Sequence, residues 1–209
     1  METSLELARK PEIVFRKYVP GEFCLAAVKC VNESYEAAFA KCSEWPDPEA
    51  HDLRPHERRA FVETGLRDVA GRYGAVASAQ PNCIGNCNHT EIRFGPVILT
   101  ASFVETPNTV VRSAEFRKTF ARSNQLYLFE SPAPPSFDDP LYCILLHGVS
   151  DDPRKPHFIQ IRFPTPDCEG YVPGSMINLL REFENMRRQT ETVPEQGIPR
   201  SLVLPSEAR

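Results

Sequence analysis

Three groups of polar residues have types and spacings that could support chemistry, and the first combines histidine with aspartate. His147 ends an apolar run, and Asp151 and Asp152 follow it in a loop rich in charge and proline. His157 begins the next apolar run. Active sites are often built at strand ends, so one aspartate could orient a histidine as a general base. The alternative is structural, with a hydrogen-bonded histidine at a sheet edge and aspartates that solvate a turn.

A second group has the residue types of a metal site. Cys83, Cys87 and His89 place two thiols and an imidazole within seven residues, which could supply three corners of a zinc tetrahedron. Structural zinc sites usually have two-residue spacings and a second ligand pair, and the other cysteines of this chain are distant in sequence. The alternative is a polar loop with two free thiols. We therefore expect no cofactor, with zinc as the one metal for which the sequence offers ligands.

The third group consists of basic residues. The candidate anion-binding residues are Arg93, Arg117, Lys118, Arg122 and Arg162. If several of them share one face, they could bind the phosphates of RNA or DNA. Acidic residues lie among them in the sequence, and none of the common RNA-binding signatures is present. A charged, solvated surface is therefore the alternative.

These residues need a scaffold, and the chain offers a sheet between residues 90 and 163. Val97–Val104 and Leu141–Gly148 are apolar or small at nearly every position, which is typical of central strands covered on both faces. Residues 91–94 and 157–163 alternate between apolar and polar, as half-exposed strands do. We expect a mainly antiparallel sheet of about four to six strands.

Helical periodicity predicts about four helices packed against this sheet, which makes the fold class α+β. They cover residues 23–43, about 57–73, a segment capped by Ser113, and about 175–188. Segments 46–57 and 75–89 are rich in proline or in small polar residues and are expected to be loops. Residues 1–20 are expected to form a short edge strand or an irregular arm, and residues 126–129 a short strand.

The length and composition fit one globular domain with an appended tail. The chain has 209 residues, of which 41% are hydrophobic and 25% charged. The expected organisation is a single α+β domain at 1–188, with a helical N-terminal part at 23–74, a sheet core at 90–163, a docking helix at 175–188 and a mobile C-terminal tail at 189–209.

Charge and cysteine usage restrict the cellular setting. A net charge of −4 gives no general attraction to nucleic acid or to an anionic membrane. No stretch approaches the roughly 20 apolar residues that cross a bilayer, and the first residues lack the apolar core of a signal peptide. Seven cysteines without a disulfide framework favour the reducing cytoplasm.

Two functional classes follow, because no resemblance to a family is specific enough to transfer residues. The first is a non-catalytic protein-binding or regulatory module of the cytoplasm, such as an inhibitor or one half of a two-component pair. The sequence has no glycine-rich phosphate loop, dinucleotide fingerprint or nucleophile elbow, which favours this class. The second is a small metal-independent hydrolase or transferase acting on a phosphate-bearing or nucleic-acid substrate. Its acid or base would be His147 or His157, with nearby arginines as an anion clamp.

Overall fold

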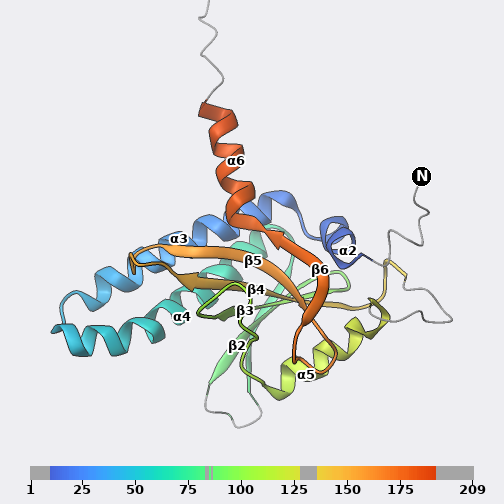
Figure 1. The fold of residues 1–209 in the computed structure, drawn as a ribbon, viewed down its shortest axis with the longest axis horizontal. Coiled ribbons are helices and arrows are strands. Elements are labelled where there is room, and N and C mark those ends of the chain that lie inside the picture. The colour runs from blue at the N-terminus through green and yellow to red at the C-terminus, as the bar shows by residue number, and fades with distance from the viewer. Residues whose placement is uncertain (1–9, 83–84, 86, 128–135, 192–209) are drawn as a thin grey trace, which may run out of the picture.

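The computed structural model describes residues 10–82, 85, 87–127 and 136–191, which form a six-stranded sheet with helices on both faces (Figure 1). The strands follow one another across the sheet in chain order. They are β1 (Val76–Pro81), β2 (Asn88–Phe94), β3 (Val97–Phe103), β4 (Leu141–Val149), β5 (Pro156–Pro164) and β6 (Tyr171–Asn178). All neighbours are antiparallel except β3 and β4, which are parallel. The predicted α+β fold is therefore confirmed.

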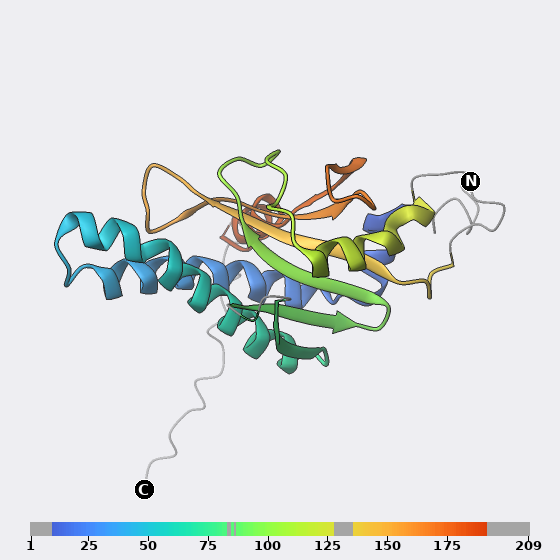
Figure 2. The same ribbon diagram turned by 90° about the horizontal axis from the view of Figure 1, so that it is seen from below.

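Within the described residues, five α-helices and one 3-10 helix accompany the sheet. They are α2 (Pro11–Tyr18), α3 (Gly21–Cys42), α4 (Asp47–Arg72), α5 (Glu115–Ala121), η1 (Arg122–Tyr127) and α6 (Leu179–Glu191). Figure 2 shows α3 and α4 on one side of the sheet and α5 on the other. The larger core lies between the sheet and α2, α3 and α4, and a smaller core lies under α5. No described helix is long and apolar enough to cross a membrane.

Strand β4 is the centre of this arrangement, and all but its last residue are buried. Leu141, Cys143 and Leu145 join the larger core, while Tyr142 and Ile144 join the smaller one. The predicted central strands are therefore neighbours, as expected. They run parallel because the chain between them crosses over the sheet through α5 before it returns.

Helices α3 and α4 form an antiparallel hairpin with a tightly packed seam. Val31 and Val62 are fully or almost fully buried within the larger core. A Cβ atom at Gly65 would lie 2.5 Å from the Sγ atom of Cys30, so the two helices approach closely at this point. The far end of the hairpin reaches beyond the sheet, in the same direction as the loop between β4 and β5 (Figures 1 and 2).

Several predicted boundaries before the sheet are wrong. Residues 11–18 are helical instead of forming a strand or an arm. Helix α4 continues through the predicted loop at 46–57 and contains Pro55 in its interior. Packing along α3 outweighs the single backbone hydrogen bond that this proline removes. The predicted loop at 75–89 contains β1, whose small residues extend because β2 offers a pairing edge.

The boundaries after β3 also differ from the prediction. Helix α5 follows Ala114 and has no side-chain cap, so the predicted cap at Ser113 is wrong. Residues 126 and 127 belong to η1, and residues 128 and 129 lie outside the described part of the chain. Segment 175–178 is strand, because buried Ile177 and exposed Met176 alternate with a period of two.

Helix α6 therefore begins four residues later than expected, at Leu179. Leu179 is buried, but beyond its first turns the helix projects away from the body (Figure 1). The expected docking on the sheet is thus confined to the start of the helix. The predicted tail at 189–209 begins inside α6, and residues 192–209 lie outside the described range.

The close contact at Gly65 gives a test of the seam. Gly65→Ala should lower the free energy of unfolding by about 1–2 kcal/mol, because the new methyl group forces the buried Cys30 thiol out of its position. Gly71→Ala, in the same helix, should raise it by about 0.5–1 kcal/mol, because no atom lies near the added Cβ. Urea denaturation measures both values.

A second substitution separates crowding from helix propensity. In the Gly65→Ala, Cys30→Ala double variant, the loss of unfolding free energy should be smaller than the sum of the losses in the two single variants. Strict additivity would contradict the proposed contact between the two positions.

Candidate functional site

His147 lies at the end of β4 and is hydrogen-bonded to the opposing helix. Its side chain is 3% exposed, and its Nδ1 atom lies 2.8 Å from the hydroxyl oxygen of Tyr35 on α3. The rings of Tyr35 and Phe103 both meet the imidazole edge to face, at centroid distances of 5.6 and 6.0 Å. The histidine is thus enclosed by aromatic side chains instead of facing water.

Arg58 of α4 completes this buried group. Its guanidinium carbon lies 4.8 Å from the centre of the Tyr35 ring and 4.7 Å from that of Phe103. The side chain is only 6% exposed, and its Nη1 atom is buried without a hydrogen-bond partner in the described part of the protein. A buried guanidinium between two aromatic faces is stabilised by cation–π attraction, but these contacts do not supply Nη1 with a hydrogen-bond acceptor.

The same arrangement repeats one turn farther along the hairpin. Arg54 precedes Arg58 by one turn of α4, and Phe39 follows Tyr35 by one turn of α3. The guanidinium carbon of Arg54 lies 4.9 Å from the centre of the Phe39 ring, and its Nε atom is also buried without a described partner. We call Tyr35, Phe39, Arg54 and Arg58 the arginine–aromatic ladder.

The electrostatics of this region follow from burial and from Arg58. Burial, and secondarily the charge of Arg58, lower the pKa of His147 from 6.5 to about 3. Burial also raises the pKa of the Tyr35 phenol, an effect that Arg58 opposes. Near neutral pH the imidazole and the phenol are therefore uncharged, and the two ladder arginines carry the positive charge. The arrangement is suited to holding an anion and poorly suited to accepting a proton at Nδ1.

The predicted aspartate partners of His147 lie elsewhere. The carboxylate of Asp152 accepts hydrogen bonds from the backbone N–H of Arg154 at 3.0 Å and from its Nε at 2.9 Å. These bonds lower the pKa of Asp152. Asp151 and His157 are exposed. The structure does not bring these three residues into a hydrogen-bonded set with His147, and the acid–base role stays a prediction.

The predicted anion-binding residues lie around α5 on the opposite side of the sheet. Three of the arginines each cover a different aromatic ring, in the pairs Arg93 with Phe120, Arg117 with Phe116 and Arg162 with Tyr171. Lys118 and Arg122 are exposed. The five residues therefore lie on the same side of the sheet, but each of the three arginines contacts a different aromatic ring. Binding of nucleic-acid phosphates there stays a prediction.

The predicted metal ligands are only partly described. Cys83 lies outside the described residues. The Sγ atom of exposed Cys87 lies 3.1 Å from Nδ2 of Asn82, and the ring of buried His89 stacks on Phe116 at 3.6 Å. No cluster of three metal-binding side chains occurs among the residues that the structure describes. The zinc site accordingly stays a prediction.

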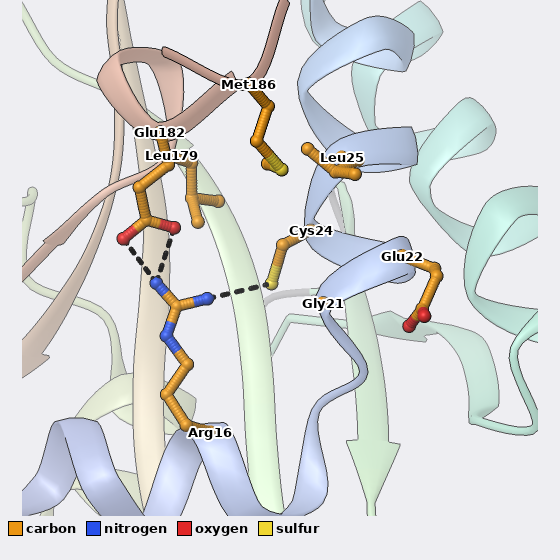
Figure 3. Close-up of a pocket in the computed structure, with 8 residues that line it drawn as sticks. All are labelled: Arg16, Gly21, Glu22, Cys24, Leu25, Leu179, Glu182 and Met186. Atoms are coloured by element: carbon orange, nitrogen blue, oxygen red, sulfur yellow. Dashed lines mark hydrogen bonds and ion pairs between the residues drawn. The ribbon is translucent and has the colours of Figure 1, made fainter. Parts of the chain in front are cut away.

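A separate hollow lies between α2, α3 and α6 (Figure 3). It has a volume of about 230 Å³ and is lined by Arg16, Gly21, Glu22, Cys24, Leu25, Leu179, Glu182 and Met186. Arg16 donates to both carboxylate oxygens of Glu182, at 2.5 and 2.6 Å, and approaches the Cys24 thiol at 3.9 Å. Burial raises the pKa of that thiol to about 11. The charges of the arginine and Glu182 are thus paired with each other, and the thiol is unreactive.

The arginine–aromatic ladder was missed in the sequence, although a signal for it exists. Arg54 and Arg58 continue the four-residue spacing of the buried α4 residues Val62, Leu66 and Ala70 toward the N-terminus. The periodicity thus places the two arginines on the buried stripe. Charged residues rarely occupy such a stripe without a partner. Two arginines at successive positions of the stripe therefore indicate that each has an unusual buried partner.

Comparison with known proteins adds no functional information. No protein-family model, curated protein or solved structure matches this chain. The function is therefore argued from the chain's own geometry.

The lowered pKa of His147 predicts a specific loss of stability in acid. The unfolded chain binds a proton near pH 6.5, whereas the folded chain resists protonation until about pH 3. The stability is therefore fully present above pH 6.5 and falls as the pH is lowered toward 3. Between pH 7.5 and pH 5.0 the loss from this residue should be about 2 kcal/mol.

Two histidine variants isolate this contribution. In His147→Gln the difference in unfolding free energy between pH 7.5 and pH 5.0 should shrink by about 2 kcal/mol. His157→Gln, which changes an exposed histidine, should leave the difference unaltered. An equal pH response of the wild type and His147→Gln would refute the buried, neutral state of the imidazole.

Proposed function

We propose that this chain is a non-catalytic, regulatory protein-binding module of the cytoplasm, and that an extended segment of its partner adds to the sheet beside β1. The observation that carries the proposal is the open, uncharged edge of that strand. No described element pairs with its outer side, and the sequence VASAQP contains no charge. Edge strands of this kind readily accept another strand, and natural proteins usually protect them.

The opposite edge of the same sheet is protected. Strand β6 contains Pro173 and Gly174, and Gly174 has a positive φ of 73°. Its pairing with β5 shifts register between Arg162 and Pro164, and α6 follows it directly. Proline and irregular pairing are the devices by which proteins discourage strand addition. The contrast favours β1 as the binding edge.

The alternation of backbone hydrogen bonds identifies the groups that a partner would use. The N–H of Asn82 donates to the carbonyl of Cys87 at 2.9 Å, next to the pair formed by Pro81 and Asn88. In an antiparallel ladder every second residue points its N–H and C=O groups inward. Ser78 and Gln80 therefore pair with β2, while Ala77 and Ala79 direct theirs outward.

The side chains of β1 indicate what kind of segment fits. Val76 is 72% exposed, and Ala77 and Ala79 are small and lie on the side of α4. A partner strand with apolar residues at alternate positions would place them beside the two alanines on the side of α4, and Val76 would offer a separate apolar contact on the opposite face of the sheet. Pro81 offers no N–H, so the added strand would be short. The partner is thus an extended, uncharged segment of another protein.

The free state of the cysteines supports the cytoplasmic setting. Every described cysteine is a free thiol, and all of them except Cys87 are buried. Such a pattern is typical of a reducing compartment. A regulator, an inhibitor or one half of a two-component pair would each use an interaction of the kind proposed for β1.

The catalytic alternative stays a second prediction, with less support from the geometry. It would use His147 or His157 as the acid or base, oriented by Asp151 or Asp152, on a phosphate-bearing or nucleic-acid substrate. The Nδ1 atom of His147 is already engaged by Tyr35, and Asp152 is engaged by Arg154. Both hydrogen bonds would have to be replaced before the predicted residues could act together.

Amide hydrogen exchange followed by NMR tests the open edge directly. In the free protein the amides of Ala77 and Ala79 should exchange at least tenfold faster than those of Ser78 and Gln80, because only the latter are bonded to β2. A peptide selected from a displayed library of about ten-residue sequences should slow the exchange of both alanine amides when it binds. Binding that protects other strands or the helices instead would overturn the proposal.

A proline substitution tests the same edge by affinity. Ala79→Pro removes an outward N–H while sparing the ladder with β2, and it should weaken binding of the selected peptide at least tenfold. Met176→Lys, on the protected edge, should change the affinity less than twofold. Fluorescence anisotropy measures both, and a melting temperature near that of the wild type shows that Ala79→Pro folds. A concentration-dependent dimer that Ala79→Pro abolishes would instead assign the edge to a second copy of this chain.

A further inference from the structure

We propose that Arg54 and Arg58 of the arginine–aromatic ladder bind a phosphate group at the far end of the α3–α4 hairpin. The ligand class is a phosphate dianion, either free or carried by a small organic molecule. The site is separate from the β1 edge and does not depend on the protein-binding function. Arg58 and Arg72 lie about 21 Å apart along α4, given its rise of about 1.5 Å per residue, and β1 follows the end of that helix.

The first support is the unpaired charge of Arg58. Neither Arg58 nor Arg54 forms an ion pair within the described structure, although Lys41, Arg59 and Arg154 of the same region each do. Charged side chains are seldom buried without a counter-ion. The aromatic rings offset part of this cost, but they leave Nη1 of Arg58 and Nε of Arg54 without an acceptor. An oxyanion would supply both the missing charge and the missing acceptors.

The second support is the number of charges and their geometry. The two arginines lie one turn apart on the same face of α4. Together they carry two positive charges, which match the charge of about −1.5 to −2 on a phosphate monoester at neutral pH. A carboxylate would neutralise only one of them. Guanidinium groups present paired N–H donors that fit phosphate oxygens.

The neighbouring side chains suit an anion better than a cation. His147 and Tyr35 are occupied with each other and are neutral near pH 7. Arg154, on the loop between β4 and β5, lies with its guanidinium carbon 5.8 Å from the centre of the Phe39 ring and brings further positive charge to the same ring. Its pairing with Asp152 moderates that contribution.

Phe103 controls access to the site. It is the last residue of β3, is 40% exposed, and covers the guanidinium of Arg58. Rotation of this one ring would open the face of the guanidinium that it covers without changing the backbone, because side chains at the surface change rotamer readily. The ring of an aromatic phosphate could then stack against Phe103, which would favour an organic phosphate over the free ion.

Isothermal titration calorimetry tests the site with inorganic phosphate, phenyl phosphate and acetate at constant ionic strength. Both phosphates should bind at least tenfold more tightly than acetate. Phenyl phosphate that binds at least tenfold more tightly than inorganic phosphate would assign the site to an organic phosphate, and equal affinities would assign it to the free ion. Phosphate that binds no better than acetate would overturn the proposal.

Matched arginine variants locate the binding. Arg54→Gln and Arg58→Gln should each weaken the binding of inorganic phosphate at least tenfold. Arg72→Gln removes the same charge from the exposed end of α4 and should weaken it less than twofold. If Arg58→Gln does not fold, Arg54→Gln decides, because its side chain is less buried. Equal weakening by Arg54→Gln and Arg72→Gln would show only a general charge effect and would refute the site.

Phe103→Ala provides a readout that loss of structure cannot mimic. Removal of the ring should accelerate the association of inorganic phosphate at least threefold, measured by stopped-flow. An unchanged or slower association would contradict the role of Phe103 as the cover. The Ala79→Pro variant should retain phosphate binding, so failure of the β1 proposal and failure of this one can be distinguished.

Discussion

Burial of β4 on both of its faces is the constraint on which the rest of the structure depends. A strand whose residues alternate between two apolar cores needs a cover on each side, and α2, α3 and α4 provide one while α5 provides the other. The parallel pairing with β3 follows from the same requirement, because the chain must cross a face before it returns. The remaining strands extend the sheet outward by antiparallel additions, as far as the edge strands β1 and β6.

The two proposed sites lie at the limits of the sheet and of the helices that cover it. At the end of β4 the apolar core gives way to His147, and the hairpin of α3 and α4 continues beyond the sheet. In this part of the hairpin, small buried residues such as Ala38 and Ala50 pack beside aromatic rings that are covered by arginines. At the other limit, β1 has no further strand to pair with within the described residues. Both sites therefore have unsatisfied polar groups among the described residues: side-chain donors of the two arginines, and backbone groups on the outer side of β1.

Sequence patterns predicted the parts of the fold that bury apolar residues at regular intervals. The apolar runs at 97–104 and 141–148 are β3 and β4, and the helical stripe at 23–43 is α3. Patterns failed where tertiary contacts outweigh local preference. Pro55 lies inside a helix because α3 supports it, and β1 is a strand because β2 pairs with it. Segment 175–178 has apolar residues that suit either a helix or an edge strand, and pairing of Ile177 with Ile161 decides for the strand.

The candidate site divides in the same way. The sequence alone determined that His147 ends an apolar run typical of a central strand. It also contained the four-residue spacing of Arg54 and Arg58 with Val62, but residues 46–57 were predicted to be a loop, so this signal was not used. Only the tertiary structure decided that Tyr35 is the partner of the histidine, that the arginines lie against aromatic rings, and that β1 is an edge. The reason is physical: periodicity reports which face of an element is buried, whereas the partner on that face is set by residues distant in the chain, such as the 112 positions that separate Tyr35 from His147.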